Sequence, residues 1–170
     1  GETTGWLLDL LQESVLIDTP LCAAALLRHI GRDPASVRAI VETHVHEDHQ
    51  GAGAAAALGA EYLKGAASFT YVGSEPAFRG FVVKVAAYLG ITEDDAYARI
   101  VAHPGDPVAA SQSVIRVRPG DTVRLLGATW HFPAWNPHPV PTMGFRIALD
   151  YRGRTYRVGY TSDTAPKPGF

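Results

Sequence analysis

The sequence predicts an α+β layered sandwich, with sheet inside and helices outside. Two observations carry this prediction. Residues 6–98 alternate between strand-like and helix-like segments, whereas residues 113–160 form a run of short strand-like segments separated by turn residues. With 170 residues, of which 46% are hydrophobic and 19% charged, the chain is long enough for one globular domain with a sizeable core. We therefore expect residues 1–170 to form a single domain.

The first elements lead towards a histidine-rich run. Residues 6–10 and 14–18 are apolar runs joined by a polar turn, which predicts a hairpin. Residues 21–30 are rich in alanine and leucine and predict a helix that ends at Gly31. Residues 37–43 then predict a strand, and the histidines follow it directly.

The middle of the chain is predicted to be mainly helical. Residues 50–58 predict a helix ending at Gly59, and residues 60–63 a short strand. Residues 74–89 predict a longer helix and residues 92–98 a shorter one, each opened by a hydroxyl residue suited to an N-cap. The core-facing stripe of the longer helix is predicted to comprise Phe78, Phe81, Val82, Val85 and Tyr88.

Five short strands are predicted in the last third, because these segments are mostly rich in β-branched and aromatic residues. They comprise residues 113–117, 121–126, 128–132, 142–149 and 155–160.

The charge and composition of the chain limit the kinds of binding partner and the cellular compartment that we expect. The formal net charge of −2 gives no indication of a nucleic-acid binder, although a metal ion can supply local positive charge for a nucleotide substrate. No apolar run reaches 18 residues and no signal peptide is visible, so we expect no membrane span. The single cysteine fits a reducing compartment, and we expect a cytoplasmic protein. Its oligomeric state stays open.

Four potential metal ligands lie within six residues: His44, His46, Asp48 and His49. Zinc prefers imidazole and carboxylate ligands, and a catalytic site keeps a position open for water. On an extended segment His44 and His46 point to the same side, and the following turn directs Asp48 and His49 to a second point nearby. The alternative is a histidine-rich loop without metal, but such dense burial of unpaired polar groups would be costly.

The run His44-Val45-His46-Glu47-Asp48-His49 resembles the His-x-His-x-Asp-His signature of the metallo-β-lactamase superfamily. Residues 16–19 (LIDT) resemble the strand of that family that ends in an aspartate, here Asp18. The resemblance implies an αββα metallo-β-lactamase-type sandwich. We do not expect Asp18 to be a ligand itself: it either caps the end of the strand or lies beside the ligands, where its carboxylate could orient a ligating imidazole.

Two later segments extend the resemblance. Residues 136–145 (NPHPVPTMGF) are similar to the family segment that delivers the next metal histidine, here His138. Residues 160–164 (YTSDT) resemble the strand end that delivers a bridging aspartate, here Asp163. Together they resemble a phosphodiesterase-like branch, some of whose members are fused to cyclic-nucleotide-binding domains.

The resemblance implies two divalent metal ions, with zinc as the default and manganese or iron as alternatives. His44, His46 and His138 would hold the first ion, and Asp48 and His49 the second, with Asp163 bridging both. The family supplies one more histidine after the position of Asp163, and no histidine follows it here. We therefore expect either a fold that is incomplete at the C-terminus or an incomplete second site.

The hypothesis for function is a metallo-hydrolase that uses a metal-bound hydroxide on a phosphodiester or nucleotide-type substrate. Asp48 would orient that hydroxide and act as general base. Three alternatives stay open: a thioester, lactone or β-lactam hydrolase of the same fold, a two-iron redox enzyme, and a non-catalytic binding module. The imidazole-rich ligand set favours hydrolysis over the redox alternative, and the substrate and the general acid are not defined by the sequence.

Overall fold

The computed structural model describes residues 5–10, 13–33, 36–63, 69–102 and 114–165. Its contacts divide the chain into two compact units, Gly1–Arg116 and Val117–Phe170. The expectation of a single domain over residues 1–170 stays a prediction. No helix among the described residues is long and apolar enough to cross a membrane.

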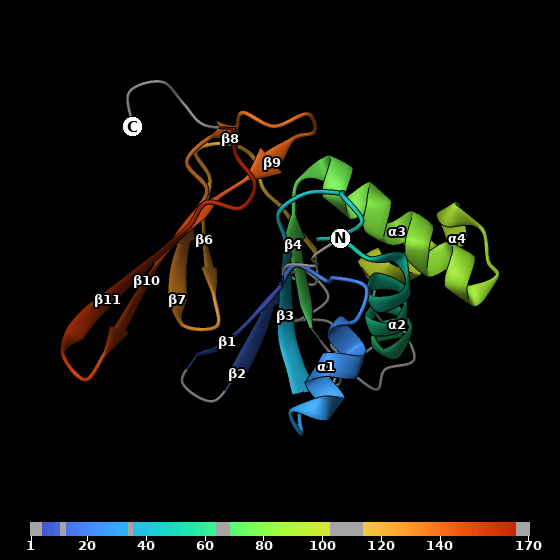
Figure 1. Ribbon diagram of the computed structural model, residues 1–170, viewed down its shortest axis with the longest axis horizontal. Coiled ribbons are helices and arrows are strands. Elements are labelled where there is room, and N and C mark those ends of the chain that lie inside the picture. Colours follow the sequence, from blue (N-terminus) through green and yellow to red (C-terminus); the bar gives the residue numbers. More distant parts are fainter. Residues whose placement is uncertain (1–4, 11–12, 34–35, 64–68, 103–113, 166–170) are drawn as a thin grey trace. The chain divides into compact units, whose positions relative to one another are not determined.

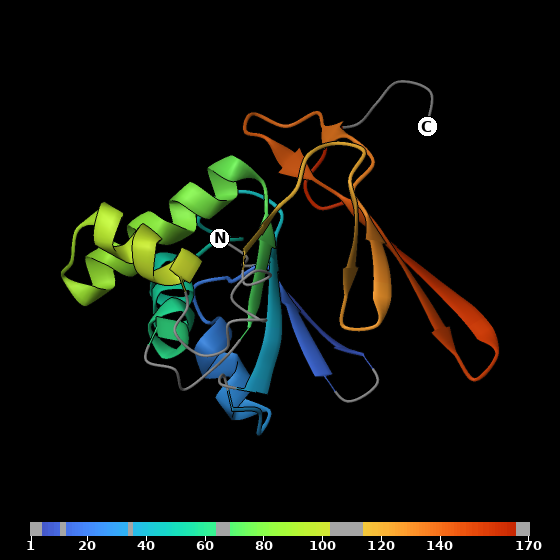
Figure 2. The ribbon, with the colours of Figure 1, turned by 180° about the vertical axis from the view of Figure 1, so that it is seen from behind.

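The first unit is built on a five-stranded sheet of order β1-β2-β3-β4-β5. The antiparallel pair β1–β2 confirms the predicted hairpin, and β3, β4 and β5 each add in parallel. Figures 1 and 2 show the helices of this unit on one face of the sheet. The strands are β1 (Trp6–Leu10), β2 (Glu13–Ile17), β3 (Val37–Glu42), β4 (Thr70–Gly73) and β5 (Val114–Arg116). The helices are α1 (Ala23–His29), α2 (Ala52–Leu63), α3 (Glu75–Leu89) and α4 (Glu93–Ala102).

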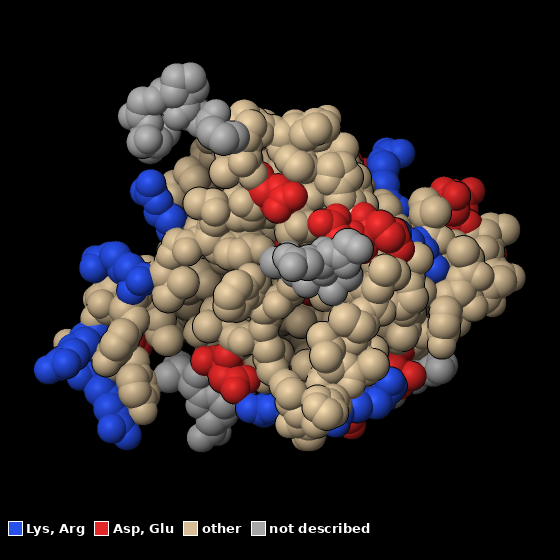
Figure 3. All heavy atoms as spheres, in the orientation of Figure 1, with Lys and Arg blue, Asp and Glu red and all other residues tan. Residues whose placement is uncertain are grey.

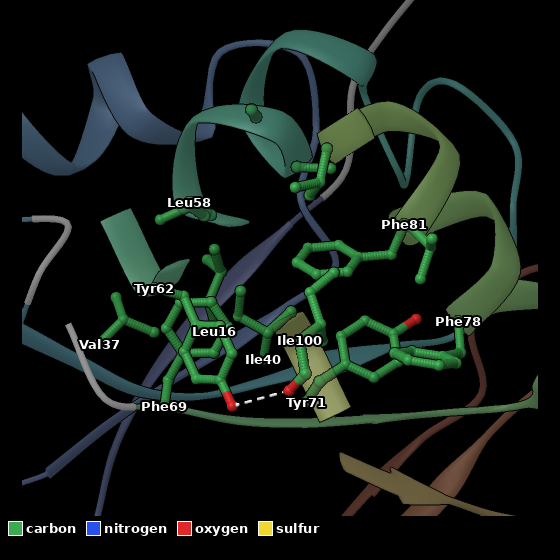
Figure 4. Packing of buried hydrophobic residues seen from close by; sticks show 14 of the residues in the cluster. Leu16, Val37, Ile40, Leu58, Tyr62, Phe69, Tyr71, Phe78, Phe81 and Ile100 are labelled. Atoms are coloured by element: carbon green, nitrogen blue, oxygen red, sulfur yellow. Dashed lines mark hydrogen bonds between the residues drawn. The ribbon is translucent and has the colours of Figure 1, made fainter. Parts of the chain in front are cut away.

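Helix α3 follows the predicted pattern closely. The Ser74 hydroxyl accepts a hydrogen bond from the Ala77 amide at the N-terminus, and Gly90 ends the helix in the left-handed conformation. Four of the five predicted core residues are buried, whereas Tyr88 is 58% exposed. It lies in the last turn before the C-cap. Figure 4 shows the core that this helix shares with α2 and the sheet, including Phe78, Phe81 and the hydrogen bond from Tyr62 to the Ile100 carbonyl.

Helix α2 corrects the prediction of a strand at residues 60–63, because the helix continues through Gly59 to Leu63. Gly59 serves close packing instead of helix termination. A Cβ at this position would lie 2.2 Å from Val85 Cγ2 on α3, so only glycine allows the two helices to approach so closely. The strand of this region lies later, at β4 (Thr70–Gly73), and was not predicted from the sequence.

The second unit holds a four-stranded antiparallel sheet of order β11-β10-β7-β6 and a two-stranded pair β8–β9. The predicted strand 142–149 is divided in two at Gly144, and β8 was not predicted. Phe145 is the centre of an aromatic cluster, with ring centroids 5.0 Å from Trp130 and 5.2 Å from Tyr160. The strands are β6 (Thr122–Leu125), β7 (Ala128–His131), β8 (Trp135–Asn136), β9 (Thr142–Met143), β10 (Phe145–Tyr151) and β11 (Arg154–Tyr160).

Basic side chains gather on the hairpin formed by β10 and β11, as the space-filling view shows (Figure 3). This hairpin carries the exposed residues Arg146, Arg152, Arg154 and Arg157.

Candidate metal centre

Polar residues that follow β2 and β3 meet at the carboxyl ends of these two strands. The two strands are neighbours and parallel, so the residues that follow them meet at the same edge of the sheet. Asp18 follows β2 with φ of 60° and donates its backbone N–H to the Val41 carbonyl at 2.9 Å. This left-handed turn directs the chain of β2 towards the residues that follow β3.

The carboxylate of Asp18, fully buried, is the hub of the site. It accepts hydrogen bonds from the Thr43 amide at 2.7 Å and from the Thr43 hydroxyl at 3.0 Å. Its Oδ2 lies 2.8 Å from His49 Nδ1. Burial raises the pKa of Asp18 above its usual value, and the contacts with His49 and Thr43 partly offset that effect. The expected role of Asp18, orientation of a neighbouring imidazole, agrees with this geometry.

These contacts define the tautomers of two histidines. With the Asp18 carboxylate as acceptor, His49 carries its proton on Nδ1, so Nε2 keeps the lone pair. The Thr43 hydroxyl donates to Asp18 and therefore accepts from His44 Nδ1, which lies 3.0 Å away. His44 thus also presents Nε2 as a potential ligand atom. A chain of hydrogen bonds runs from His44 through Thr43 and Asp18 to His49.

Three imidazoles are clustered at this edge. The ring centroid of His44 lies 4.9 Å from that of His46 and 4.3 Å from that of His49. His44 offers a ligand atom within 4.8 Å of one on each of the other two rings. Asp48 Oδ2 lies 3.8 Å from His49 Nε2, and the Asp48 side chain is 47% exposed. Imidazole and carboxylate donors at these spacings suit a divalent cation, so the residues of the first unit fit the implied metal.

A tight turn holds the histidine run. The His46 carbonyl accepts hydrogen bonds from the His49 amide at 3.0 Å and the Gln50 amide at 2.7 Å. The chain then forms a bridge to the residue after Asp18, because the Thr19 amide donates to the His49 carbonyl at 2.6 Å and the Thr19 carbonyl accepts from the Gly51 amide at 2.7 Å. The turn from His46 to Gln50 is therefore fixed at both ends. We call these five residues the histidine turn.

Glu42 is a second buried carboxyl group, at the end of β3. It accepts a hydrogen bond of 2.5 Å from the Thr19 hydroxyl. Burial, and secondly the neighbouring charge of Asp18, raise the pKa of Glu42 well above its usual value.

The second unit brings His138 and Asp163 together. His138 Nε2 lies 4.0 Å from Asp163 Oδ2, and their side chains are 15% and 42% exposed. Asn136 joins the two segments, since its side-chain amide donates to the carbonyls of Thr161 and Asp163, the latter at 3.2 Å. Gly144 permits this arrangement, because a Cβ there would lie 2.6 Å from the Tyr160 carbonyl oxygen.

Each unit thus gathers its own predicted site residues. The first unit brings together His44, His46, Asp48 and His49, and the second brings together His138 and Asp163. That all six hold metal stays a prediction. Thr43 and Asn136 position these residues through hydrogen bonds, and neither was predicted from the sequence. A hydroxyl residue directly before the first histidine was the available signal for Thr43.

No family model matches the chain, and no curated protein matches it. Several solved structures, in contrast, are similar to the chain. YhfI of Bacillus subtilis, a metallo-β-lactamase fold protein, is 20% identical over 98% of this chain and 57% of its own, with a TM-score of 0.61. A B3 metallo-β-lactamase with an active-site glutamic acid is 21% identical over 98% of this chain and 60% of its own, with a TM-score of 0.57.

A diphosphatase from the PhnP family is 18% identical over 86% of this chain and 48% of its own, with a TM-score of 0.58. These likenesses show that the chain has the metallo-β-lactamase fold, as the histidine signature predicted. The chain spans 60% or less of the length of each of these three structures.

Proposed function

We propose that this chain is part of a metal-dependent hydrolase that acts on a phosphodiester or nucleotide-type substrate. The observation that carries the proposal is the buried hydrogen-bond chain that ends on Nδ1 of His44 and Nδ1 of His49. It leaves the Nε2 atom of each ring as the ligand atom. A polar network that orients imidazoles in this way is typical of metal sites.

The proposed ligand set draws on both units. His44, His46 and His138 would hold the first ion and Asp48 and His49 the second, and Asp163 would be a ligand shared by the two. Three imidazoles and a carboxylate favour zinc, and the more oxygen-rich second set also suits manganese. When bound, such a pair of ions makes water acidic enough to attack at neutral pH and stabilises negative charge on the substrate.

The residues of the chain have separate tasks in this proposal. The buried Asp18 keeps His49 in one tautomer and one orientation. Asp48 is half exposed and lies beside His49, so its carboxylate is a proton acceptor that water can reach. Its carboxylate oxygen accepts a proton from the attacking water as general base.

The preference for a phosphoester has two supports. The residues around His138 and Asp163 resemble the phosphodiesterase-like branch, and a diphosphatase is among the solved structures of this fold. The likeness to B3 metallo-β-lactamases makes the β-lactam bond the first alternative to test.

The experiment is hydrolysis of bis(4-nitrophenyl) phosphate by the zinc- or manganese-loaded chain, with nitrocefin and a thioester as parallel substrates. His46→Ala should abolish hydrolysis with the melting temperature retained. His29→Ala, an exposed histidine at the end of α1, is the matched control and should be fully active. Preferential cleavage of nitrocefin or the thioester would overturn the substrate assignment. Metal binding without any hydrolysis would instead identify a binding module.

A further inference from the structure

Helix α3 contacts the histidine turn through Lys84. The Lys84 side chain is only 15% exposed, and its Nζ lies 3.2 Å from Glu47 Oε2. The same ammonium group donates a hydrogen bond to the backbone carbonyl of Gln50. Lys84 therefore contacts the second and the last residue of the turn at once.

Glu47 also contacts helix α2. Its other carboxylate oxygen, Oε1, accepts a hydrogen bond from the Ala52 amide at 2.6 Å, at the first residue of α2. A carboxylate at this position satisfies an otherwise unpaired helix N–H group and favourably meets the helix dipole. The ion pair with Lys84 thus connects α3, the histidine turn and the start of α2.

Two further contacts come from the same face of α3. The Gln50 side-chain amide donates to the Ala77 carbonyl at 2.9 Å. A Cβ on Gly80 would lie 2.6 Å from Gln50 Oε1, so the turn approaches the helix at a position where a side chain does not fit. Ala77, Gly80 and Lys84 are spaced i, i+3 and i+7, which places them on one helix face. Among these residues, Lys84 alone supplies a charge to the turn.

We infer that Lys84 is a positioning residue for the metal centre. By holding Glu47 and the Gln50 carbonyl, it maintains the turn in which the His46 carbonyl accepts the amides of His49 and Gln50. The directions of the His46 and His49 rings depend on that turn. The inference concerns the site of the proposed function and rests on it, but the shape of the turn is measurable without metal.

The first test is amide hydrogen exchange of the metal-free chain carrying Lys84→Met, which keeps most of the length of the side chain and removes its charge. We expect exchange at the His49 and Gln50 amides to be about ten-fold faster, with exchange in α4 unchanged. Arg79→Met is the matched control, because Arg79 lies on the same helix, is 78% exposed and pairs only with the exposed Glu75 among the ion pairs described. It should leave both amides as in the wild type.

The second test is metal binding by the same variants. Loss of a group that orients metal ligands typically weakens binding 10- to 100-fold. We therefore expect about ten-fold weaker zinc binding by Lys84→Met, an altered visible spectrum of the cobalt form, and substantial recovery with Lys84→Arg, which restores the charge even if the methionine variant folds poorly. Unchanged exchange and unchanged zinc affinity in Lys84→Met would overturn the inference, as would an equal loss in Arg79→Met. A wild type that binds no zinc refutes the proposed function, and the exchange experiment still decides the role of Lys84.

Discussion

His49 Nδ1 and Asp18 Oδ2 lie 2.8 Å apart, although 31 residues separate them in the sequence. They meet because each follows one of two neighbouring parallel strands, whose carboxyl ends share an edge of the sheet. Both side chains are buried, with exposed fractions of 2% for His49 and 0% for Asp18. The topology of the sheet is thus what fixes the orientation of a candidate metal ligand.

Removing the charge of Asp18 should weaken metal binding. In Asp18→Asn the side chain keeps its shape, and asparagine tolerates the positive φ of this position, so the fold is expected to survive. Zinc affinity should fall roughly 10- to 100-fold, because the acceptor that orients His49 becomes neutral. Zinc titration against a competing chelator measures this. Asp9→Asn, which removes an exposed carboxylate paired with Arg32, is the control and should bind as the wild type; equal affinities for all three proteins would refute the role of Asp18.

Adding a Cβ atom at Gly144, where the backbone of another segment lies close, should destabilise the second unit. The added Cβ of Gly144→Ala would lie 2.6 Å from the Tyr160 carbonyl oxygen and 3.0 Å from that of Thr161. Overpacking of this kind costs about 1–3 kcal/mol of unfolding free energy, measurable by urea denaturation. Gly159→Ala lies on the neighbouring strand with nothing within 4 Å of the new Cβ, so it should cause little change. Equal stability of the two variants would contradict this packing.

The contact between α2 and α3 at Gly59 gives a third prediction. Gly59→Ala should lower the melting temperature, because the new Cβ would lie 2.2 Å from Val85 Cγ2. Adding Val85→Ala should remove the clash, so the double variant should lose less stability than the sum of the two single changes. Gly53→Ala, in the first turn of the same helix with open space around it, should be neutral or stabilising. Simple additivity at positions 59 and 85 would show that the two residues are not in contact.

Glu42 should make the metal-free protein less stable as the pH rises. Its pKa in the folded state is raised well above the ordinary value of 4.5, so the folded state holds a proton that the unfolded state releases. Its contribution is therefore fully present below pH 4.5 and is lost as the pH rises towards the folded-state pKa. Glu42→Gln should flatten this dependence and be at least as stable as the wild type at pH 8. Urea denaturation in the presence of a chelator, from pH 5 to 8, measures the slope; identical slopes would contradict the prediction.

Much of the fold followed from local pattern. The hairpin β1–β2, the strand leading into His44 and helix α3 were predicted because their periodicity, caps and turn residues all agree. Helix α2 was predicted too short because Gly59 has the local signature of a helix end. Its actual role is set by Val85, a residue of another helix, and no local pattern contains that information. The break at Gly144 escaped prediction for the same reason.

Some residues of the candidate site were likewise predicted from the sequence, and others were not. His44, His46, Asp48 and His49 were predicted as ligands because they form one dense run, and His138 and Asp163 because their segments resemble a known family. The roles of Thr43 and Asn136 were not predicted, although Thr43 directly precedes the histidine run and Asn136 begins the segment that resembles the family. These roles arise from hydrogen bonds to residues far away in the sequence. Lys84 is a further case, because a lysine on an amphipathic helix ordinarily belongs to the solvated face.

The most direct test of the central claim is the zinc stoichiometry of the purified chain, determined by elemental analysis after loading and removal of loosely bound ions. The ligand set proposed here predicts two zinc ions per chain, falling to one or none in His44→Ala and unchanged in His29→Ala. A wild-type ratio near one would contradict the two-metal centre. A ratio near zero would contradict metal binding by the histidine run altogether.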